Sequence, residues 1–400
     1  MDLVNQVTTN TVLFDYNRDE LLPFTYTRPV ADIRIGILTL REHWEALLSC
    51  PTSTHTADYL GGKYPAWKES GNLFINAAVI PNEGLATAVR SLKLGQRLVS
   101  NNIPIAAFSS EWSDPVNGGQ SFSDIPFEGE TIIIRSKWDI FALNDKVLRA
   151  QFKLLTAGKK SQQLSSSNKL IGNGDLFIEQ GARVEASIIN TTTGPVYIGK
   201  NAEVMEGCMI RGPFALGEQA VLKMGAKIYG ATTVGPHSKV GGEINNSVIF
   251  GYSNKAHDGF LGNSVIGEWC NLGADTNNSN LKNNYSSVKV WSIGKGTYED
   301  TGLVFCGLFM GDHSKCAINS SFNTGTVCGV GANIFGNGFP PKMIPSFSWG
   351  GFPGAARFEK DKALGLARQV YQRRGMEFGA IDEKILTEVY HLTESTEPQI

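Results

Sequence analysis

The sequence predicts an α/β domain followed by an all-β solenoid of short parallel strands, with helices at its carboxyl end. The main observation is that small apolar residues recur at every sixth position. An α-helix rotates such residues onto different faces, whereas a three-sided coil of short strands points each of them inward. The spacing therefore indicates a left-handed parallel β-helix of hexapeptide repeats over residues 170–345. The first run is Ile198, Val204, Ile210, Leu216, Leu222, Ile228, Val234 and Val240, and the second is Val304, Met310, Cys316, Phe322, Cys328 and Ile334.

Length and charge narrow the class of protein. Four hundred residues are enough for two or three domains, and a net charge of −2 without a basic patch gives no reason to expect nucleic acid or a membrane surface as partner. The amino-terminal segment lacks the basic start and long apolar stretch of a signal peptide, so we expect a cytoplasmic protein. None of the cysteines forms a CxxC pair, and Cys316 and Cys328 fall on the six-residue period. Buried thiols are therefore expected rather than disulfides or zinc ligands.

Residues 1–160 alternate between strand and helix patterns, as is typical of an α/β domain. The expected strands are Thr11–Phe14, Leu73–Ile80, Ile103–Phe108 and Thr131–Ile134. The expected helices are Ile37–Leu48, Ala86–Asn101 and Trp138–Leu155. The polar stretch Gly158–Asn168 is the best candidate for a linker to the solenoid.

The solenoid is interrupted once and then ends in a different pattern. Asn277–Tyr285 is polar and breaks the period, which predicts an inserted loop between coils. After Phe347–Phe352, residues 355–377 and 382–394 have helical spacing and form an extension over 355–400. We expect these helices to cover the last coil, whose edge would otherwise expose unpaired backbone groups.

One window of the solenoid, residues 254–276, carries most of the chemistry. Its motifs are His257, Leu261-Gly262, Ile266-Gly267 and Asn271-Leu272-Gly273-Ala274. At this spacing the window resembles the acetyltransferase half of the bifunctional enzymes that make UDP-N-acetylglucosamine. The resemblance implies that His257 is the general base, which takes a proton from the amine of glucosamine 1-phosphate as that amine attacks acetyl-CoA. An imidazole suits this step because histidine exchanges protons near neutral pH.

The same resemblance implies further contacts by position. Substrate contacts are Glu243, Asn271, Asn280 and Lys227, and acyl-donor contacts are Ala274, His313 and Ile318. His313 is also the alternative base. The sequence departs from the family at Asn245, Phe260 and Leu281, where a lysine and two tyrosines are usual. Such solenoids place their acyl sites between neighbouring prisms, so we expect a homotrimer.

The amino-terminal part resembles the sugar-1-phosphate nucleotidyltransferase half of the same enzymes. The strand Thr11–Phe14 is present, but Asp15–Asp19 replaces the glycine-rich loop that cradles nucleotide phosphates. The resemblance implies UTP as substrate and Mg²⁺ as cofactor, because phosphoryl transfer needs charge neutralisation. Positive charge is expected from Arg18 and Arg28, and Mg²⁺ ligands from Asp15, Asn76 and Asn144.

Over nearly its whole length the chain resembles a divergent Bacteroidetes-type family of UDP-N-acetylglucosamine diphosphorylase/glucosamine-1-phosphate acetyltransferases. Residues 14–45 and 307–351 carry this resemblance. Three alternatives stay open. His257-Asp258 with Leu261-Gly262-Asn263 also resembles UDP-N-acetylglucosamine O-acyltransferases, which use acyl carrier protein. The amino-terminal domain, without its glycine loop, is alternatively a non-catalytic sugar-nucleotide-binding module. The third alternative is a purely structural solenoid.

Overall fold

The computed structural model describes residues 9–112 and 121–398. Its contacts divide the chain into two compact units. The first consists of Met1–Arg18, Arg28–Ile33 and Leu38–Arg135, and the second of Asp19–Thr27, Arg34–Ile37 and Ser136–Ile400. The second unit thus includes two short segments from the amino-terminal part of the sequence. Most of the segment examined for a signal peptide lies outside the described residues, and among the described helices none has the length and apolar character to span a membrane.

The first unit is a mixed six-stranded sheet in the order β4-β1-β5-β8-β7-β9. Its strands are β1 (Thr9–Phe14), β4 (Ser53–His55), β5 (Gly71–Asn76), β7 (Gln96–Ser100), β8 (Ile103–Ser109) and β9 (Ser123–Pro126). Two short strands, β6 (Val79–Ile80) and β10 (Ile132–Ile133), pair with each other, and β3 (Leu38–Thr39) precedes helix α1 (Leu40–Leu48). Parallel pairing of β1 with β4 and β5 brings Phe14, His55 and Asn76 into register at one edge of the sheet.

The helices of the first unit begin at side-chain caps. Thr39 and Glu42 form a capping box at the start of α1, and Asn82 caps α2 (Glu83–Arg90). The predicted helix Ala86–Asn101 is wrong in its second half. The chain turns at Gly95, whose φ of +82° favours glycine, and Gln96–Ser100 then pairs with β8 as strand β7. The backbone pairing with β8 overrides the helical spacing.

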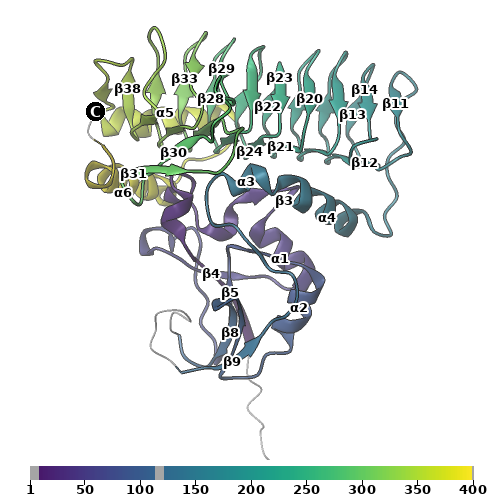
Figure 1. Ribbon diagram of the computed structural model, residues 1–400, viewed down its shortest axis with the longest axis vertical. Coiled ribbons are helices and arrows are strands. Elements are labelled where there is room, and N and C mark those ends of the chain that lie inside the picture. The colour runs from purple at the N-terminus through teal and green to yellow at the C-terminus, as the bar shows by residue number, and fades with distance from the viewer. Residues whose placement is uncertain (1–8, 113–120, 399–400) are drawn as a thin grey trace, which may run out of the picture. The chain divides into compact units, whose positions relative to one another are not determined.

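The second unit is built on a parallel β-solenoid, as the sequence predicted (Figure 1). Its coils form three sheets of six, nine and ten strands. The six-stranded sheet contains β11 (Lys169–Ile171), β14 (Ile188–Asn190), β17 (Met209–Arg211), β20 (Lys227–Tyr229), β23 (Glu243–Asn245) and β26 (Phe260–Gly262). The nine-stranded sheet contains β12 (Leu176–Ile178), β15 (Val196–Ile198), β18 (Phe214–Leu216), β21 (Thr232–Val234), β24 (Val248–Ile249), β27 (Val265–Ile266), β32 (Leu308–Met310), β35 (Thr326–Cys328) and β37 (Met343–Ile344). The ten-stranded sheet contains β13 (Arg183–Val184), β16 (Glu203–Val204), β19 (Val221–Leu222), β22 (Lys239–Val240), β25 (Asn254–Lys255), β28 (Asn271–Leu272), β33 (Lys315–Cys316), β36 (Asn333–Ile334), β38 (Ser348–Gly350) and β39 (Ala356–Arg357).

The six-residue period marks the inside of the solenoid. Every residue of the two predicted runs is buried in one continuous core except Val304, which is 39 % exposed. Val304 lies in an insertion rather than in a coil, so its place in the predicted run is wrong. Cys316 and Cys328 are buried free thiols, as expected.

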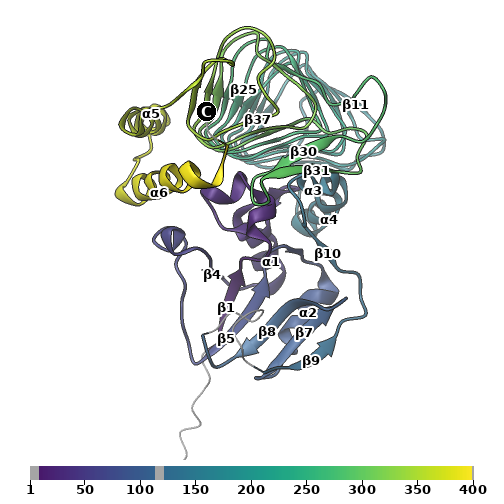
Figure 2. The same cartoon turned by 60° about the vertical axis from the view of Figure 1, so that its left-hand side comes forward.

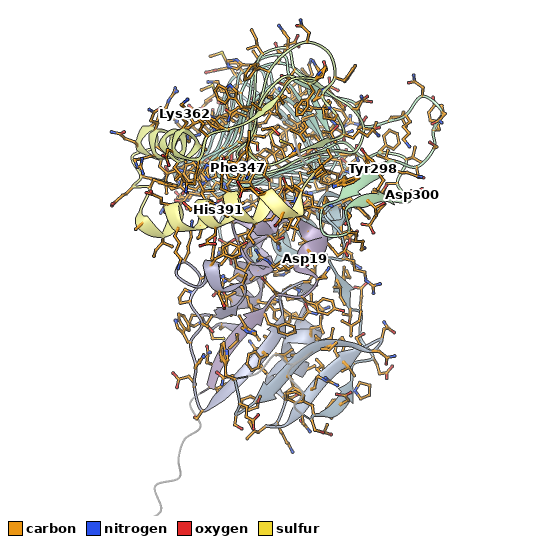
Figure 3. All side chains as sticks on the ribbon, turned by 90° about the vertical axis from the view of Figure 1, so that its left-hand side faces the viewer. Asp19, Tyr298, Asp300, Phe347, Lys362 and His391 are labelled. Carbon is orange, nitrogen blue, oxygen red and sulfur yellow. The ribbon has the colours of Figure 1, made fainter. Side chains whose placement is uncertain are left out.

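The insertion begins later than predicted. Asn277 and Asn278 form strand β29, which pairs with β34 (Ser321–Phe322) and so continues a coil. The insertion that follows contains an antiparallel hairpin of β30 (Lys289–Ser292) and β31 (Thr297–Asp300). Figure 3 labels Tyr298 and Asp300 on this hairpin.

Two helices that the sequence placed at the end of the first domain fold with the solenoid. The expected helix Trp138–Leu155 is divided into α3 (Asp139–Ala142) and α4 (Asn144–Thr156), and both belong to the second unit together with β2 (Arg34–Ile35). The predicted linker that follows them covers the first coil. Its Gln162 amide donates to Ile178 O at 2.7 Å, and Leu164 packs on the solenoid core.

The carboxyl end packs along the side of the solenoid, from the coil of His237 to that of Phe347, rather than only over the last coil. After β38 pairs antiparallel with β39, helices α5 (Lys360–Arg373) and α6 (Ala380–Thr396) lie beside the solenoid (Figure 2). The predicted helix 355–377 is wrong at its start, because Ala356 and Arg357 form a strand. Phe347 of the solenoid and Tyr390 of α6 bring their rings to 4.8 Å, next to the labelled His391 in Figure 3.

Candidate functional site

A cleft of about 630 Å³ lies against the ten-stranded sheet of the solenoid. It brings together four residues that the sequence predicted as site residues: His257, Asn271, Ala274 and Ile318. Strands β25, β28 and β33 stack in register, so Asn254, Asn271 and Lys315 form one outward-facing row. The turns after these three strands carry His257, Ala274 and Ile318 to the same end of the row. The stacking of the coils in register therefore collects residues that lie far apart in the sequence.

The end of α5 supplies a further wall of the cleft through Val370, Arg373 and Arg374. Arg374 donates hydrogen bonds to His237 O at 2.9 Å and to Asn254 Oδ1 at 3.0 Å. Tyr371 stacks on Trp269 with ring centroids 4.0 Å apart. These contacts fasten the carboxyl end of α5 to the coils and leave Arg373 exposed.

Stacked rings at one corner of the solenoid support this wall. His237, Tyr252, Trp269 and His313 occupy the corner in successive coils, each with φ near +60°. Ring centroids of Tyr252 and Trp269 are 4.3 Å apart, and His313 is stacked 6.2 Å from Trp269 and 6.1 Å from Tyr371. His313 is only 8 % exposed. The prediction that it contacts the acyl donor is therefore corrected: packing under Tyr371 places it behind the cleft wall.

The cleft is strongly cationic. Its charged lining side chains are Lys239, Lys315, Arg373 and Arg374, and none of the described residues that line it is acidic. Burial lowers the pKa of Lys315 to about 8. This lining favours an anionic ligand. The sequence analysis missed all four cations; adjacent Arg373 and Arg374 before Gly375, at the end of a predicted helix, were the available signal.

Two predicted substrate residues lie in a different cleft, of about 780 Å³, on the six-stranded sheet. These are Lys227 and Glu243. The Tyr229 hydroxyl donates to Glu243 Oε1 at 2.6 Å, and burial together with this bond raises the pKa of Tyr229 to about 12. Asn280 lines neither cleft; its side chain donates to Asn263 Oδ1 at 2.8 Å. Within one chain, the predicted substrate contacts therefore lie in three places: the two clefts and the contact between Asn280 and Asn263.

The residues predicted to bind nucleotide phosphates form a network after β1. Arg18 pairs with Asp15 at 3.0 Å and donates to Tyr59 Oη at 2.6 Å. Asp15 also accepts the amide of Val30 at 2.7 Å. Arg28 is buried, with 4 % of its surface exposed. This network lies in the segment that, by the sequence resemblance, replaces a glycine-rich loop.

The predicted Mg²⁺ ligands do not fit a metal site. Asn76 and Asn144 are fully buried. The Asn76 amide oxygen accepts the amide of Ala78, and that of Asn144 accepts the amide of Gly36 at 2.7 Å. Both oxygens therefore serve internal packing, and Asp15 is bonded as described. Within residues 9–112 and 121–398, no cluster of three or more histidine, cysteine or acidic side chains is arranged to hold a metal ion.

Comparisons with known proteins give a family match for the amino-terminal part. The family described as sugar nucleotidyl transferase matches residues 11–160. A bifunctional sugar-1-phosphate nucleotidylyltransferase/acetyltransferase of Sulfurisphaera tokodaii is 30 % identical over 144 residues, which are 36 % of this chain and 35 % of the relative. A bifunctional protein GlmU of Ruthia magnifica is 23 % identical over 228 residues, which are 51 % of this chain and 47 % of the relative.

Residues 11–160 thus match the sugar nucleotidyl transferase family, and parts of the chain are similar to GlmU-like bifunctional transferases. The chain spans less than half of the length of each of these two relatives. Among solved structures, a Francisella novicida UDP-N-acetylglucosamine acyltransferase gives a TM-score of 0.29 at 12 % identity, covering 57 % of this chain and 76 % of that one. The segment that matches the sugar nucleotidyl transferase family, residues 11–160, extends through α4, which in this structure packs in the solenoid unit.

Proposed function

We propose that the solenoid cleft transfers an acetyl group from acetyl-CoA to the amine of glucosamine 1-phosphate, and that the amino-terminal unit joins the product to UTP. The observation that carries the proposal is the grouping of His257, Asn271 and Ala274 in one cationic cleft. The name of the Sulfurisphaera tokodaii relative, a bifunctional sugar-1-phosphate nucleotidylyltransferase/acetyltransferase, agrees with both kinds of reaction. Both substrates of the first reaction carry phosphates, which suits the charge of the lining.

The chemistry follows from the exposed imidazole of His257. The neutral amine of the sugar attacks the thioester carbonyl carbon. As the nitrogen–carbon bond forms, the His257 ring accepts a proton from that nitrogen. The carbon–sulfur bond then breaks, and the imidazolium returns the proton to the leaving thiolate. The amide of Asn271, on the outer row beside this turn, offers both a donor and an acceptor for a sugar hydroxyl.

Arg373, Lys239 and Lys315 supply the attraction for the donor. A CoA thioester carries several phosphates, and guanidinium groups bind phosphate with paired hydrogen bonds. Arg374 has a different role, because its hydrogen bonds to His237 and Asn254 hold the helix end in place. The exposed Arg373 is the side chain we assign to a donor phosphate.

The homotrimer belongs to the same proposal. The six-stranded sheet exposes large apolar side chains, among them Ile188 at 44 % and Met209 at 48 %. A second copy packed on this sheet would bury them, and the cleft with Lys227 and Glu243 would then contribute to a site shared between copies. Light scattering tests this: a particle of three chain masses supports it, and a monomer removes it. Location in the cytoplasm also stays a prediction.

A second function is favoured for the amino-terminal unit by the network after β1. Asp15 and Arg18 form an ion pair there, and the buried amide oxygen of Asn76 accepts the backbone amide of Ala78. We therefore assign no step to Mg²⁺. The alternative is a module that binds a sugar nucleotide without turning it over.

One pair of assays separates these functions. Thiol release from acetyl-CoA, with and without glucosamine 1-phosphate, tests the solenoid. Pyrophosphate release from UTP and N-acetylglucosamine 1-phosphate, with and without Mg²⁺, tests the amino-terminal unit. Turnover in both assays supports the bifunctional proposal. Turnover in the first alone, with calorimetric binding of UDP-N-acetylglucosamine, supports the binding module, and the absence of acetyl transfer overturns the main proposal.

A further inference from the structure

One charged side chain lies inside the solenoid, in the coil that carries His257. The inward column of the ten-stranded sheet is apolar on both sides of it: Val184, Val204, Leu222, Val240, then Lys255, then Leu272, Cys316 and Ile334. Lys255 is 1 % exposed. A buried ammonium group is costly unless hydrogen bonds compensate for lost water. We therefore expect hydrogen-bond acceptors close to the Lys255 ammonium group that compensate for its burial.

The turn that follows Lys255 supplies such acceptors. Its Nζ donates to the backbone oxygens of His257 and Asp258, the latter at 3.0 Å, and to Gly241 O at 3.3 Å. Three N–H donors thus meet three carbonyl oxygens, which matches the capacity of an ammonium group. Two of these oxygens belong to the turn from which the His257 imidazole projects.

The next coil holds the corresponding turn in a different way. There, the hydroxyl of Thr276 donates to Gly273 O at 2.7 Å and holds the turn that carries Ala274. Gly259 occupies the corresponding corner in the His257 coil and has no side chain to donate. A side chain is excluded at Gly259 because its φ is +115° and because a Cβ there would lie 2.2 Å from Thr276 O. The ammonium of Lys255 reaches this corner from inside the coil.

We propose that Lys255 is the positioning residue of the acyl-transfer site: its ammonium group fixes the backbone at His257 and Asp258 and so sets where the imidazole stands in the cleft. The inference rests on the proposed function of His257. Burial lowers the pKa of Lys255 to about 8, while nearby Asp258, Cys316 and Asp275 act in the opposite direction. The group is therefore charged at pH 7, with all three donors present.

The test is Lys255→Met, which keeps the length and removes the donors. We expect kcat for acetyl transfer to fall at least tenfold, with the KM values of acetyl-CoA and glucosamine 1-phosphate within twofold of the wild type. A purely structural role would instead reduce the amount of folded enzyme and leave kcat per folded molecule unchanged. Leu222→Met, in the same inward column, is the matched control and keeps wild-type kcat. If Lys255→Met does not fold, Lys255→Leu takes its place, because leucine occupies this column in other coils.

Hydrogen exchange provides a second readout that does not depend on activity. The amides of Glu243 and Asp275 donate to Gly259 O at 3.2 Å and to Asp258 O at 3.0 Å, so they report on the turn. We expect at least tenfold faster exchange at both amides in Lys255→Met and no change in Leu222→Met. Unchanged exchange, or kcat within twofold of the wild type, overturns the inference. Absence of turnover in the wild type removes the acyl-transfer function instead, and exchange then decides whether Lys255 holds the turn.

Discussion

At the end of β1, the carboxylate of Asp15 accepts hydrogen bonds from Arg18 and from the backbone of Val30, whereas in the solenoid cleft His257 and Arg373 are exposed. The sequence predicted Asp15, Arg18 and His257 as site residues. Arg373 was not predicted, but it lines the same cleft as His257. Buried polar groups that are hydrogen-bonded contribute to stability, and their loss leaves a partner unsatisfied. Exposed side chains contribute little to stability. Substitutions in the two regions should therefore affect different quantities.

The largest effect is expected for His257→Ala. We expect kcat/KM for acetyl transfer to fall by about 10²-fold or more, because general-base catalysis contributes about 10²–10⁴-fold. The free energy of unfolding should change by no more than about 0.5 kcal/mol, as for other exposed positions. Steady-state thiol release and urea unfolding measure the two quantities. His391→Ala on α6 is the control, and equal activity in both variants would show that the base lies elsewhere.

The opposite pattern is expected for Asn144→Ala. The Asn144 side chain accepts the amide of Gly36 and donates to Ala231 O at 2.8 Å, so its loss leaves two buried groups without partners. We expect the free energy of unfolding to fall by about 2 kcal/mol and acetyl transfer by the folded fraction to be unchanged. The neighbouring Asp145→Ala, which breaks only an exposed pair with Arg149, should cost less than about 1 kcal/mol. Unchanged stability together with a lost magnesium-dependent UTP reaction would instead restore the metal-ligand prediction.

Arg373→Gln sharpens the comparison within the cleft. Loss of one charge-assisted hydrogen bond to a phosphate should raise the KM of acetyl-CoA about tenfold with little change in kcat. Stability should not change, because Arg373 is exposed. The control is Lys362→Gln, an exposed substitution near the other end of α5 that removes only a pair with Glu359. An equal rise of KM in both variants would mean that the overall positive charge of α5, and not a specific contact of Arg373, attracts acetyl-CoA.

The smallest effect concerns pH. Burial lowers the pKa of Lys315 to about 8, so this group is cationic below pH 8 and neutral above it. The KM of acetyl-CoA should therefore rise by about threefold as pH increases through 8, as expected for one partly exposed charge pair. Lys315→Gln should remove this step, whereas Arg373→Gln should retain it because arginine does not titrate there. A pH step that persists in Lys315→Gln would assign it to another group.

Linkage gives the sign of the matching stability change. The pKa of Lys315 is lower in the folded protein than the ordinary lysine value of 10.5. The unfolded chain therefore binds more protons between pH 8 and 10.5, and the free energy of unfolding rises with pH over that interval. Lys315→Gln should flatten this rise, measured by urea unfolding at pH 7.5 and pH 10. Measuring both the KM of acetyl-CoA and urea unfolding in the same buffers thus distinguishes an effect of pH on binding from an effect on folding.

Sequence reasoning succeeded where structure repeats locally. The six-residue period located the inward face correctly, and the stacked coils bring His257, Asn271 and Ala274, which the family resemblance had selected, into one cleft. It failed where partners come from distant segments. Gln96–Ser100 has helical spacing, but pairing with β8 makes it a strand. Asn144 has a neighbour pattern typical of a metal ligand, but Gly36 and Ala231 engage its amide.

The sequence by itself determined the solenoid and its inward residues. Each of these depends on backbone geometry that recurs within about 20 residues and is therefore visible as a period. Only the tertiary structure decided that α5 brings Arg373 to the cleft, that His313 packs behind Tyr371, and that Lys255 supports the turn at His257. Those outcomes depend on which segments lie next to one another after folding, because a side chain's role follows from the partners that packing gives it.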